Sequence, residues 1–238
     1  MTPDHVAPSA PAAPSGLVAG SGSGSAEGPD GEVADRFRPR PVERTTVVHH
    51  GMIWDVVRDR VDLGEAGTVE REYVRHTGAV CVLAVDDEDR VLLLRQYRHP
   101  VRHELWEPPA GLLDVAGEDP LLAAQRELAE EADLVATDWA VLLDWFSSPG
   151  GMDEALRCYV ARGLSEVPEG DRHTREAEEH AMPTRWVPLD DVKDAVLAGR
   201  IHNPAAVVSV LAAWAARADG WRTLRPADAP WPEHPRLR

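Results

Sequence analysis

The chain has 238 residues, the length of one large domain or of a domain with appendages. Its formal net charge of -16 argues against a protein that binds nucleic acid through phosphate contacts, because such proteins usually carry a basic surface. No apolar run reaches the ~18 residues of a membrane span, and no basic and apolar N-terminal signal pattern is visible. Cys81 and Cys158 lie in apolar runs, which is typical of buried reduced thiols in a cytoplasmic protein.

Residues 1–36 are expected to form a disordered tail. Among the first 34 residues, 23 are Ala, Gly, Ser or Pro, without periodicity and with almost nothing to bury. A processed targeting segment is the weaker alternative, because basic residues are absent. The remainder divides into an N-terminal β region at 37–76, a main domain at 77–218 and a Pro-rich C-terminal tail at 219–238 that is expected to be loose.

The first part of the folded chain is predicted to consist of strands. Residues 42–50 are β-branched, and residues 54–63 and 68–74 alternate between apolar and charged. Residues 78–85 are apolar on both faces, which favours a central strand. A turn at Asp86 to Asp89 is expected to lead into residues 90–98 as the hairpin partner of that strand.

A Pro-rich loop is predicted at 102–111, followed by the clearest helix in the chain. Asp119 is a good N-cap residue and Pro120 fits the first helical position. The later elements are predicted as strands at 139–146, 155–163 and 184–189, an acidic loop at 170–180, and helices at 190–200 and 204–217. This order predicts an α+β fold, a mixed sheet with helices on its faces, and excludes a regular βαβ series.

Three carboxylates are expected to share one face of the central helix. Glu127, Glu130 and Glu131 are spaced by three and four residues, and such neighbours repel one another without a cation. Hard oxygen ligands suit Mg²⁺ or Mn²⁺ rather than zinc. A solvated acidic helix face is the alternative, but it does not explain the preceding Gly-bearing loop, Glu118 and Arg126.

The segment from Gly111 to Leu134 resembles the Nudix box. In that family the box runs Gly, five residues, Glu, seven residues, then Arg-Glu-apolar-x-Glu-Glu-x-Gly-apolar. Glu118 and Arg126 have the required seven residues between them, and the box residues from Arg126 to Leu134 match except one. Six residues instead of five separate Gly111 from Glu118, and Asp133 stands in place of the family's Gly. Neither departure removes a ligand, and Asp tolerates the left-handed geometry of a helix end.

The flanking segments resemble the ADP-ribose pyrophosphatase branch of the family. The chain has LLLRQYRHP and LWEPPAG before the box and SPGGMDE after it, with Pro149 similar to the marker proline of that branch. The resemblance implies an α/β/α Nudix sandwich and metal-dependent hydrolysis of ADP-ribose to AMP and ribose 5-phosphate. Hydrolysis of another nucleotide sugar such as GDP-mannose stays open, and a non-catalytic ADP-ribose sensor is a distant alternative, because the box glutamates are intact.

The resemblance also assigns the metal site. Glu127 and Glu131 are the principal ligands, with Glu130 and the Ala110 carbonyl as further ligands, and Glu131 counts among the catalytic residues. The structural members of the box are expected to be Gly111, Glu118 and Arg126. Arg126 is expected to hold the glutamates rather than the substrate.

A general base is expected outside the box, on the acidic loop at 170–180. By resemblance Glu179 is the first choice and Glu178 the second, with Glu176 or Glu154 as fallbacks. A lid over the metals would exclude water and position the nucleophile. A solvated loop without such a role is the alternative.

Four residues are predicted to contact the substrate. Arg98 is suited to a phosphate, Glu107 to ribose hydroxyls and Trp54 to stacking on adenine, while Arg71 resembles a ligand-contacting position. A surface cation at Arg98 and a core or interface tryptophan at Trp54 are the alternatives. Because strand neighbours face opposite ways, only one of the pairs Arg95 with Tyr97 and Gln96 with Arg98 is expected to reach the site.

The N-terminal strands are expected to mediate a homodimer. Their apolar faces, formed by Trp54, Val56, Val61 and Leu63, would stay exposed in a single chain, and related ADP-ribose pyrophosphatases exchange such strands between subunits. Arg71 or Trp54 would then reach the substrate bound by the partner. The expected partners are therefore a nucleotide-sugar substrate and a second copy of the chain, with no nucleic acid and no membrane.

Overall fold

The computed structural model describes residues 33–174 and 182–237. Most of the tail predicted at 1–36, and the loop residues Glu176, Glu178 and Glu179, lie outside these ranges. Residues 33–38 belong to a separate N-terminal unit, in which they are exposed and form neither helix nor strand. The description below concerns residues 39–237.

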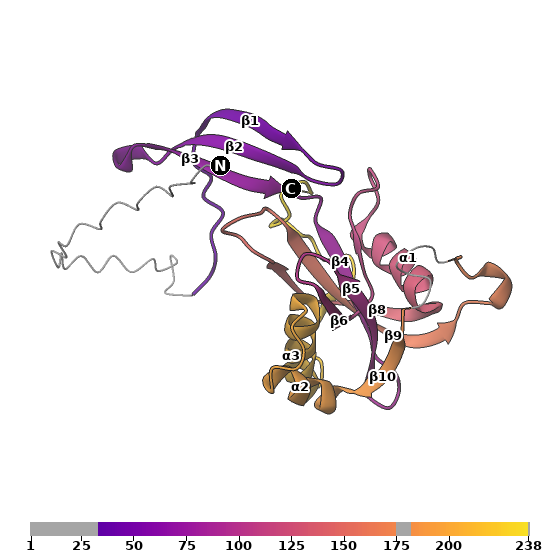
Figure 1. Cartoon of the computed structure of the whole chain (residues 1–238). Coiled ribbons are helices and arrows are strands. Elements are labelled where there is room, and N and C mark those ends of the chain that lie inside the picture. Colours follow the sequence, from indigo (N-terminus) through magenta and orange to yellow (C-terminus); the bar gives the residue numbers. More distant parts are fainter. Residues whose placement is uncertain (1–32, 175–181, 238) are drawn as a thin grey trace, which may run out of the picture. The chain divides into compact units, whose positions relative to one another are not determined.

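Strands and helices alternate irregularly along the chain (Figure 1). The strands are β1 (Val42–His50), β2 (Asp55–Asp62), β3 (Thr68–Arg75), β4 (Ala79–Ala84), β5 (Arg90–Arg98), β6 (His103–Glu107), β7 (Ala110–Leu112), β8 (Leu134–Phe146), β9 (Ala155–Glu166), β10 (Thr184–Pro188) and β11 (Arg225–Pro226). The helices are α1 (Pro120–Ala132), α2 (Leu189–Leu197) and α3 (Pro204–Ala218), with 3-10 turns at Gly64–Ala66 and Glu169–Asp171.

The strands form three sheets. An antiparallel sheet has the order β1-β2-β3, a second has the order β10-β5-β6, and the five-stranded sheet has the order β11-β8-β9-β4-β7. The pair β4 and β9 is parallel and all other pairs are antiparallel, so the large sheet is mixed. The predicted α+β class with a mixed sheet and an antiparallel N-terminal region is confirmed.

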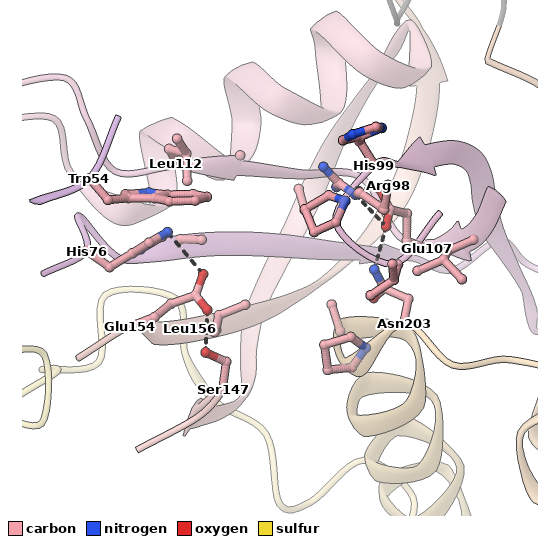
Figure 2. A pocket seen from close by; sticks show the side chains of 18 of the residues that line it. Trp54, His76, Arg98, His99, Glu107, Leu112, Ser147, Glu154, Leu156 and Asn203 are labelled. Atoms are coloured by element: carbon pink, nitrogen blue, oxygen red, sulfur yellow. Dashed lines mark hydrogen bonds and ion pairs between the residues drawn. The ribbon is translucent and has the colours of Figure 1, made fainter. Parts of the chain in front are cut away.

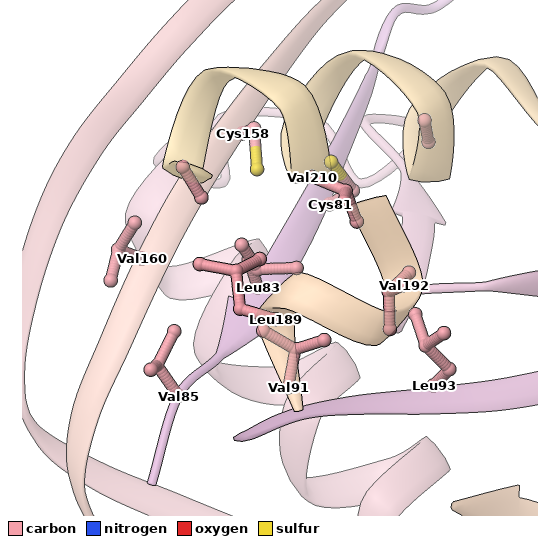
Figure 3. Close-up of a cluster of buried hydrophobic side chains, with 12 residues drawn as sticks. Cys81, Leu83, Val85, Val91, Leu93, Cys158, Val160, Leu189, Val192 and Val210 are labelled. Carbon is pink, nitrogen blue, oxygen red and sulfur yellow. The ribbon is translucent and has the colours of Figure 1, made fainter. Parts of the chain in front are cut away.

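Strand β4 holds the core together because its two faces pack against different helices. Odd-numbered residues such as Cys81 and Leu83 pack in a cluster with α2 and α3, as Figure 3 shows. Even-numbered residues such as Val80 and Val82 pack in a second cluster with Leu128 of α1. This two-residue period is the one expected for a strand with helices on both faces, and it confirms the prediction of a central strand.

Two predictions about the segment after β4 are wrong. The turn at Asp86 to Asp89 forms, but only Val85 and Val91 bridge beyond it, and β5 then pairs with β6 and β10 in another sheet. The predicted loop at 102–111 contains two strands, β6 and β7. The pairing of β5 with β10 and of β7 with β4 joins segments that are distant in the sequence, so local alternation cannot report it. Strand β6 follows β5 directly as a hairpin, and it was missed because Pro108 and Pro109 favoured a loop.

The C-terminal segment is packed rather than loose. Trp231 is only 6% exposed and His234 is 2% exposed. The guanidinium of Arg157 lies 4.7 Å from the centroid of the Trp231 ring and donates hydrogen bonds to the carbonyls of Ala229 and Pro230. The expectation failed because a Pro-rich composition does not reveal two side chains that fill a gap beside β9.

The N-terminal sheet is tied to the core by its last strand. The Val74 N–H donates to the Gly151 carbonyl at 2.9 Å, and the Asp153 N–H donates to the Val74 carbonyl at 3.2 Å. These bonds place the loop after β8 beside the end of β3.

In the described ranges, no helix is long and apolar enough to cross a bilayer.

Candidate active site

A cavity of about 670 Å³ lies where the N-terminal sheet, the strands β5 to β7 and the start of α3 meet. Figure 2 shows two polar groups at its ends, one around Glu154 and the other around Glu107. Its lining residues are Trp54, His76, Ala79, Tyr97, Arg98, His99, Pro100, Val101, Leu105, Glu107, Ala110, Gly111, Leu112, Ser147, Glu154, Leu156, Asn203, Pro204 and Ala205. A mostly apolar hollow with a few convergent polar groups is the usual form of a small-molecule site.

One end of the cavity is organised by His76, which is 5% exposed. Its Nδ1 accepts from the Gly78 N–H at 3.0 Å, so in the neutral ring Nε2 carries the proton. That Nε2 lies 3.4 Å from Glu154 Oε1, and the other Glu154 oxygen accepts from the Ser147 hydroxyl. Burial lowers the pKa of His76 from its ordinary value and so favours the neutral ring, although the charge of Glu154 acts in the opposite direction.

Trp54 covers this end of the cavity. Its ring centroid lies 5.1 Å from that of His76, with an interplanar angle of 31°. The tryptophan is held there by a tight turn in which the Gly51 N–H donates to the Trp54 carbonyl at 2.9 Å. Because 42% of Trp54 is exposed, its ring is available for stacking on a planar ligand.

The other end of the cavity is organised by Glu107, which is 2% exposed. Its two carboxylate oxygens accept from Nε and Nη2 of Arg98, the former at 3.2 Å, and Oε2 also accepts from Nδ2 of Asn203. Burial raises the pKa of Glu107, and Arg98 opposes that shift. Since both oxygens are taken by protein donors, the geometry favours Glu107 as the counter-ion of Arg98 over the predicted ribose contact.

Helix α1 presents the three box carboxylates. Asp119 caps it by accepting from the Leu121 N–H at 2.8 Å, and Pro120 occupies its first turn. At the other end Asp133 adopts the left-handed conformation with φ of 55°, where glycine is usually favoured. Asp133 therefore adopts the backbone conformation that the family's Gly would adopt at this position, and the replacement of that Gly does not disturb the end of the helix.

Arg126 gathers the carboxylates of the box around one guanidinium. Its Nε and Nη2 both lie 3.1 Å from the Glu118 carboxylate, while Nη1 lies 2.6 Å from Glu127 and 3.1 Å from Glu130. The bonds from Arg126 lower the pKa of Glu118 below its ordinary value. The arrangement suits the predicted structural roles of Glu118 and Arg126, which stay predictions.

Strand β7 contacts both the cavity and the carboxylates of α1 through Ala110 and Gly111. The Ala110 N–H donates to Glu131 Oε2 at 2.8 Å. A Cβ on Gly111 would lie 2.0 Å from the carboxyl carbon and from Oε1 of Glu127, so only glycine allows this approach. Glu131, at 7% exposure, and Glu127 are therefore fixed directly behind one wall of the cavity.

The chemistry of these oxygens fits a hard divalent cation. Glu127 and Glu131 lie one helical turn apart, and the missing side chain of Gly111 leaves the loop backbone close to both. Within the described ranges, no three side chains of His, Cys, Asp or Glu are already assembled into a metal cluster. Among the described residues, Arg126 places a positive charge beside Glu127 and Glu130.

Other predicted site residues lie elsewhere. Arg71, on β3, donates to the Glu70 carbonyl at 2.9 Å and does not line this cavity. Glu178 and Glu179 fall in the segment that the structure does not describe. A second hollow of about 610 Å³ is lined by Arg126, Ala129, Glu130 and residues 171–174.

The sequence reading also missed several lining residues. Strand alternation predicted that only one of the two pairs would reach the site, but Tyr97 and Arg98, one member of each pair, both line the cavity. The cavity meets the end of β5 and the residues that follow it, rather than one face of the strand. His76 and Ser147 were not considered, and Glu154 was only a fallback base. Asn203 precedes Pro204 at the start of an apolar helix, which is a detectable cap signal but carries no information about Glu107.

Comparisons with known proteins agree with this geometry. Residues 74–207 match the family model described as the NUDIX domain. The chain is 44% identical over 188 residues to an ADP-ribose pyrophosphatase of Mycobacterium tuberculosis, covering 79% of this chain and 89% of the relative. It is 36% identical over 164 residues to an ADP-ribose pyrophosphatase of Bacillus subtilis, covering 68% and 86%.

A solved structure shares the fold. It is described as an ADP compounds hydrolase and matches with a TM-score of 0.64 at 20% sequence identity. The match covers 79% of this chain and 99% of the other. At this identity the likeness supports the arrangement of strands and helices alone.

Proposed function

This chain belongs to the Nudix family, and we propose that it hydrolyses the pyrophosphate bond of ADP-ribose to AMP and ribose 5-phosphate. One observation carries the proposal: strand β7, which contacts Glu127 and Glu131, is also a wall of the 670 Å³ cavity. A substrate in that cavity would bring its pyrophosphate to the strand that contacts both carboxylates. The volume lies within the range of about 300–1,000 Å³ typical of small-molecule sites.

Nudix hydrolases generally need a divalent cation, and we propose Mg²⁺, with Mn²⁺ as the alternative. The residues that would hold it are Glu127, Glu130, Glu131 and the Ala110 carbonyl. When bound, such cations offset the charge of the pyrophosphate and lower the pKa of a coordinated water. The residues of the chain position these ligands. Gly111 lets strand β7 approach the Glu127 carboxylate, and Arg126 restrains Glu127 and Glu130.

The cavity wall offers two substrate contacts. Arg98 uses Nε and Nη2 for Glu107, and in the described residues no hydrogen bond engages its Nη1, which we assign to a phosphate oxygen. Trp54 would stack on the adenine, with His76 behind it. Glu107 would act mainly through Arg98, and Arg71 would contact the substrate only from a neighbouring subunit.

The hydrolysis requires water to attack one phosphorus as the bond to the bridging oxygen breaks. We assign the general base to Glu179, with Glu178 as second choice. Glu179→Gln is expected to lower kcat at least ~10²-fold with KM nearly unchanged, since the proton is taken only in the transition state. Glu178→Gln is the matched control. If it alone shows the large loss, the assignment is off by one residue, and if neither does, Glu154 becomes the candidate.

We further propose a cytoplasmic homodimer. Val48 of β1 and Met52 and Ile53 of the following turn are exposed apolar side chains on the N-terminal sheet, and a second copy would cover them. Cys81 and Cys158 are free and buried, which supports a reducing compartment.

Product analysis tests the proposed reaction. The protein is incubated with ADP-ribose and Mg²⁺, and the products are separated and quantified. Equimolar AMP and ribose 5-phosphate are expected, with activity lost in EDTA and restored by Mg²⁺ or Mn²⁺. Glu131→Gln should lower kcat at least ~10²-fold, by analogy with the loss of one preorganised electrostatic group. Tight binding of ADP-ribose without any turnover by the wild type would favour the sensor alternative instead.

A further inference from the structure

Asn203 makes two different hydrogen bonds with the two ends of its side-chain amide. Its Oδ1 accepts from the Ala206 N–H at 3.1 Å and so caps the N-terminus of α3. Its Nδ2 donates to Oε2 of Glu107, which is 96 residues away in the sequence. The amide therefore links the start of α3 to the buried carboxylate at the end of the cavity, as Figure 2 shows.

Glu107 depends on this bond because it is almost completely buried. Its Oε2 has two donors, Asn203 Nδ2 and Arg98 Nε, and its Oε1 accepts from Arg98 Nη2. Such paired bonds between a carboxylate and a guanidinium fix the plane of both groups. Without the donor from Asn203, Oε2 would keep one long bond of 3.2 Å in a place that water scarcely reaches.

We propose that Asn203 is a positioning residue for substrate binding, which orients Glu107 and thereby aims the Arg98 guanidinium into the cavity. The inference rests on the proposed function in one respect, that Arg98 meets a phosphate of ADP-ribose. Asn203 acts through its two neighbours and takes no part in the bond-breaking step. Its loss should therefore raise KM while kcat stays nearly unchanged.

Asn203→Asp separates capping from positioning. Aspartate caps a helix as well as asparagine, so the bond from Ala206 is kept, but the donor to Glu107 is replaced by a second carboxylate. The matched control is Asp119→Asn, the reverse exchange at the N-cap of α1, where the side chain accepts from Leu121. Asn203→Ser, which also caps well but is shorter and neutral, serves if Asn203→Asp fails to fold.

The expected result is a rise in KM for ADP-ribose of roughly tenfold or more in Asn203→Asp, the size of a lost hydrogen bond to a charged group. The kcat should stay within about threefold, and the Asp119→Asn control should keep the wild-type KM.

A double-mutant cycle with Arg98→Ala decides whether the effect passes through the arginine. In the Arg98→Ala background, Asn203→Asp should raise KM no further, because the group that it aims is gone. Equal effects of Asn203→Asp with and without Arg98, or an unchanged KM in both Asn203→Asp and Asn203→Ser, would overturn the inference. If the wild type does not hydrolyse ADP-ribose at all, the proposed function fails, and the same cycle is then measured on the Kd of inorganic pyrophosphate, whose coupling between Asn203 and Arg98 still decides the inference.

Discussion

At the scale of single residues, the arrangement of the box carboxylates depends on the residues around them. Gly111 is the clearest case, because the space that a Cβ would fill is occupied by the Glu127 carboxyl group. Glu118 is another, since it holds Arg126, which in turn reaches Glu127 and Glu130. The box pattern thus encodes a geometry as well as a set of ligands.

Gly111→Ala should lower kcat at least tenfold although it removes no ligand. The new methyl group would lie 2.0 Å from Glu127 Oε1, so the carboxylate or the loop must move. A displacement of about 1 Å costs up to ~10²-fold in well-aligned sites. The matched control is Gly170→Ala, where a Cβ would meet nothing within 4 Å and φ is ordinary. Equal kcat values for the two variants would show that the Gly111 contact is irrelevant.

Glu118→Gln should lower the free energy of unfolding at pH 7, and the difference from the wild type should shrink as the pH becomes acid. The pKa of Glu118 is lowered in the folded chain by Arg126, so its stabilisation is fully present above the ordinary value of 4.5 and is lost as pH falls through the lower folded pKa. The expected loss is about 1 kcal/mol of unfolding free energy at pH 7, a charged hydrogen bond reduced by solvent screening. Urea titrations of both proteins at pH 7 and near pH 3.5 measure it. A difference that grows toward acid pH would contradict the assignment.

At the scale of elements, the sequence predicts what is locally determined. Helix α1 follows from Asp119, Pro120 and the glutamate spacing, and β4 follows from an apolar run that only a central strand tolerates. The box residues were located for the same reason, since they lie in one helix and the loop before it. The pairing of β5 with β10 and of β7 with β4 was missed because pairing between distant segments leaves no local signal. The hairpin of β5 and β6 was missed because the prolines after it favoured a loop. His76 and Asn203 were missed, and Glu154 was considered only as a fallback base, because their partners meet only in the folded chain.

The C-terminal segment shows the same limit, and its packing can be tested with Trp231→Ala. This change should lower the unfolding free energy by about 3 kcal/mol, the lower end for truncating a buried tryptophan. The variant also removes the ring that contacts the Arg157 guanidinium, although Arg157 keeps its 2.7 Å hydrogen bond to Asp144. The control is Trp214→Ala, where 39% of the residue is already exposed. A destabilisation no greater than that of Trp214→Ala would restore the interpretation of a loose tail.

At the scale of the whole molecule, the N-terminal region contributes an aromatic side chain to the cavity and hydrogen bonds to one of its loops. It brings Trp54 to the cavity and ends in β3, whose last residues bond to the loop that bears Glu154. Its exposed apolar residues would be explained by a second copy of the chain. That proposal includes a contact between Arg71 and the substrate bound by the second copy.

Deletions and one point variant test the assembly. Light scattering of the full-length protein should report a dimer, with a total interface of ~2,000 Å² or more, the size of obligate pairs. Removing residues 1–35 should leave dimer and activity intact, whereas removing residues 1–72 should abolish both. Ile53→Asp, at an exposed position, should weaken the dimer without unfolding the chain. A stable, fully active wild-type monomer would refute the proposed homodimer.

The central claim is that this cavity selects ADP-ribose, and the most direct measurement is kcat/KM across a panel of nucleotide sugars under Mg²⁺. ADP-ribose and GDP-mannose are the decisive members, since both carry the same pyrophosphate and differ in the groups that Trp54 and the cavity walls would contact. The predicted result is a kcat/KM for ADP-ribose at least ~10²-fold above that for every other member, within the range that one well-matched pocket achieves. A higher kcat/KM for GDP-mannose, or equal values across the panel, would contradict the account.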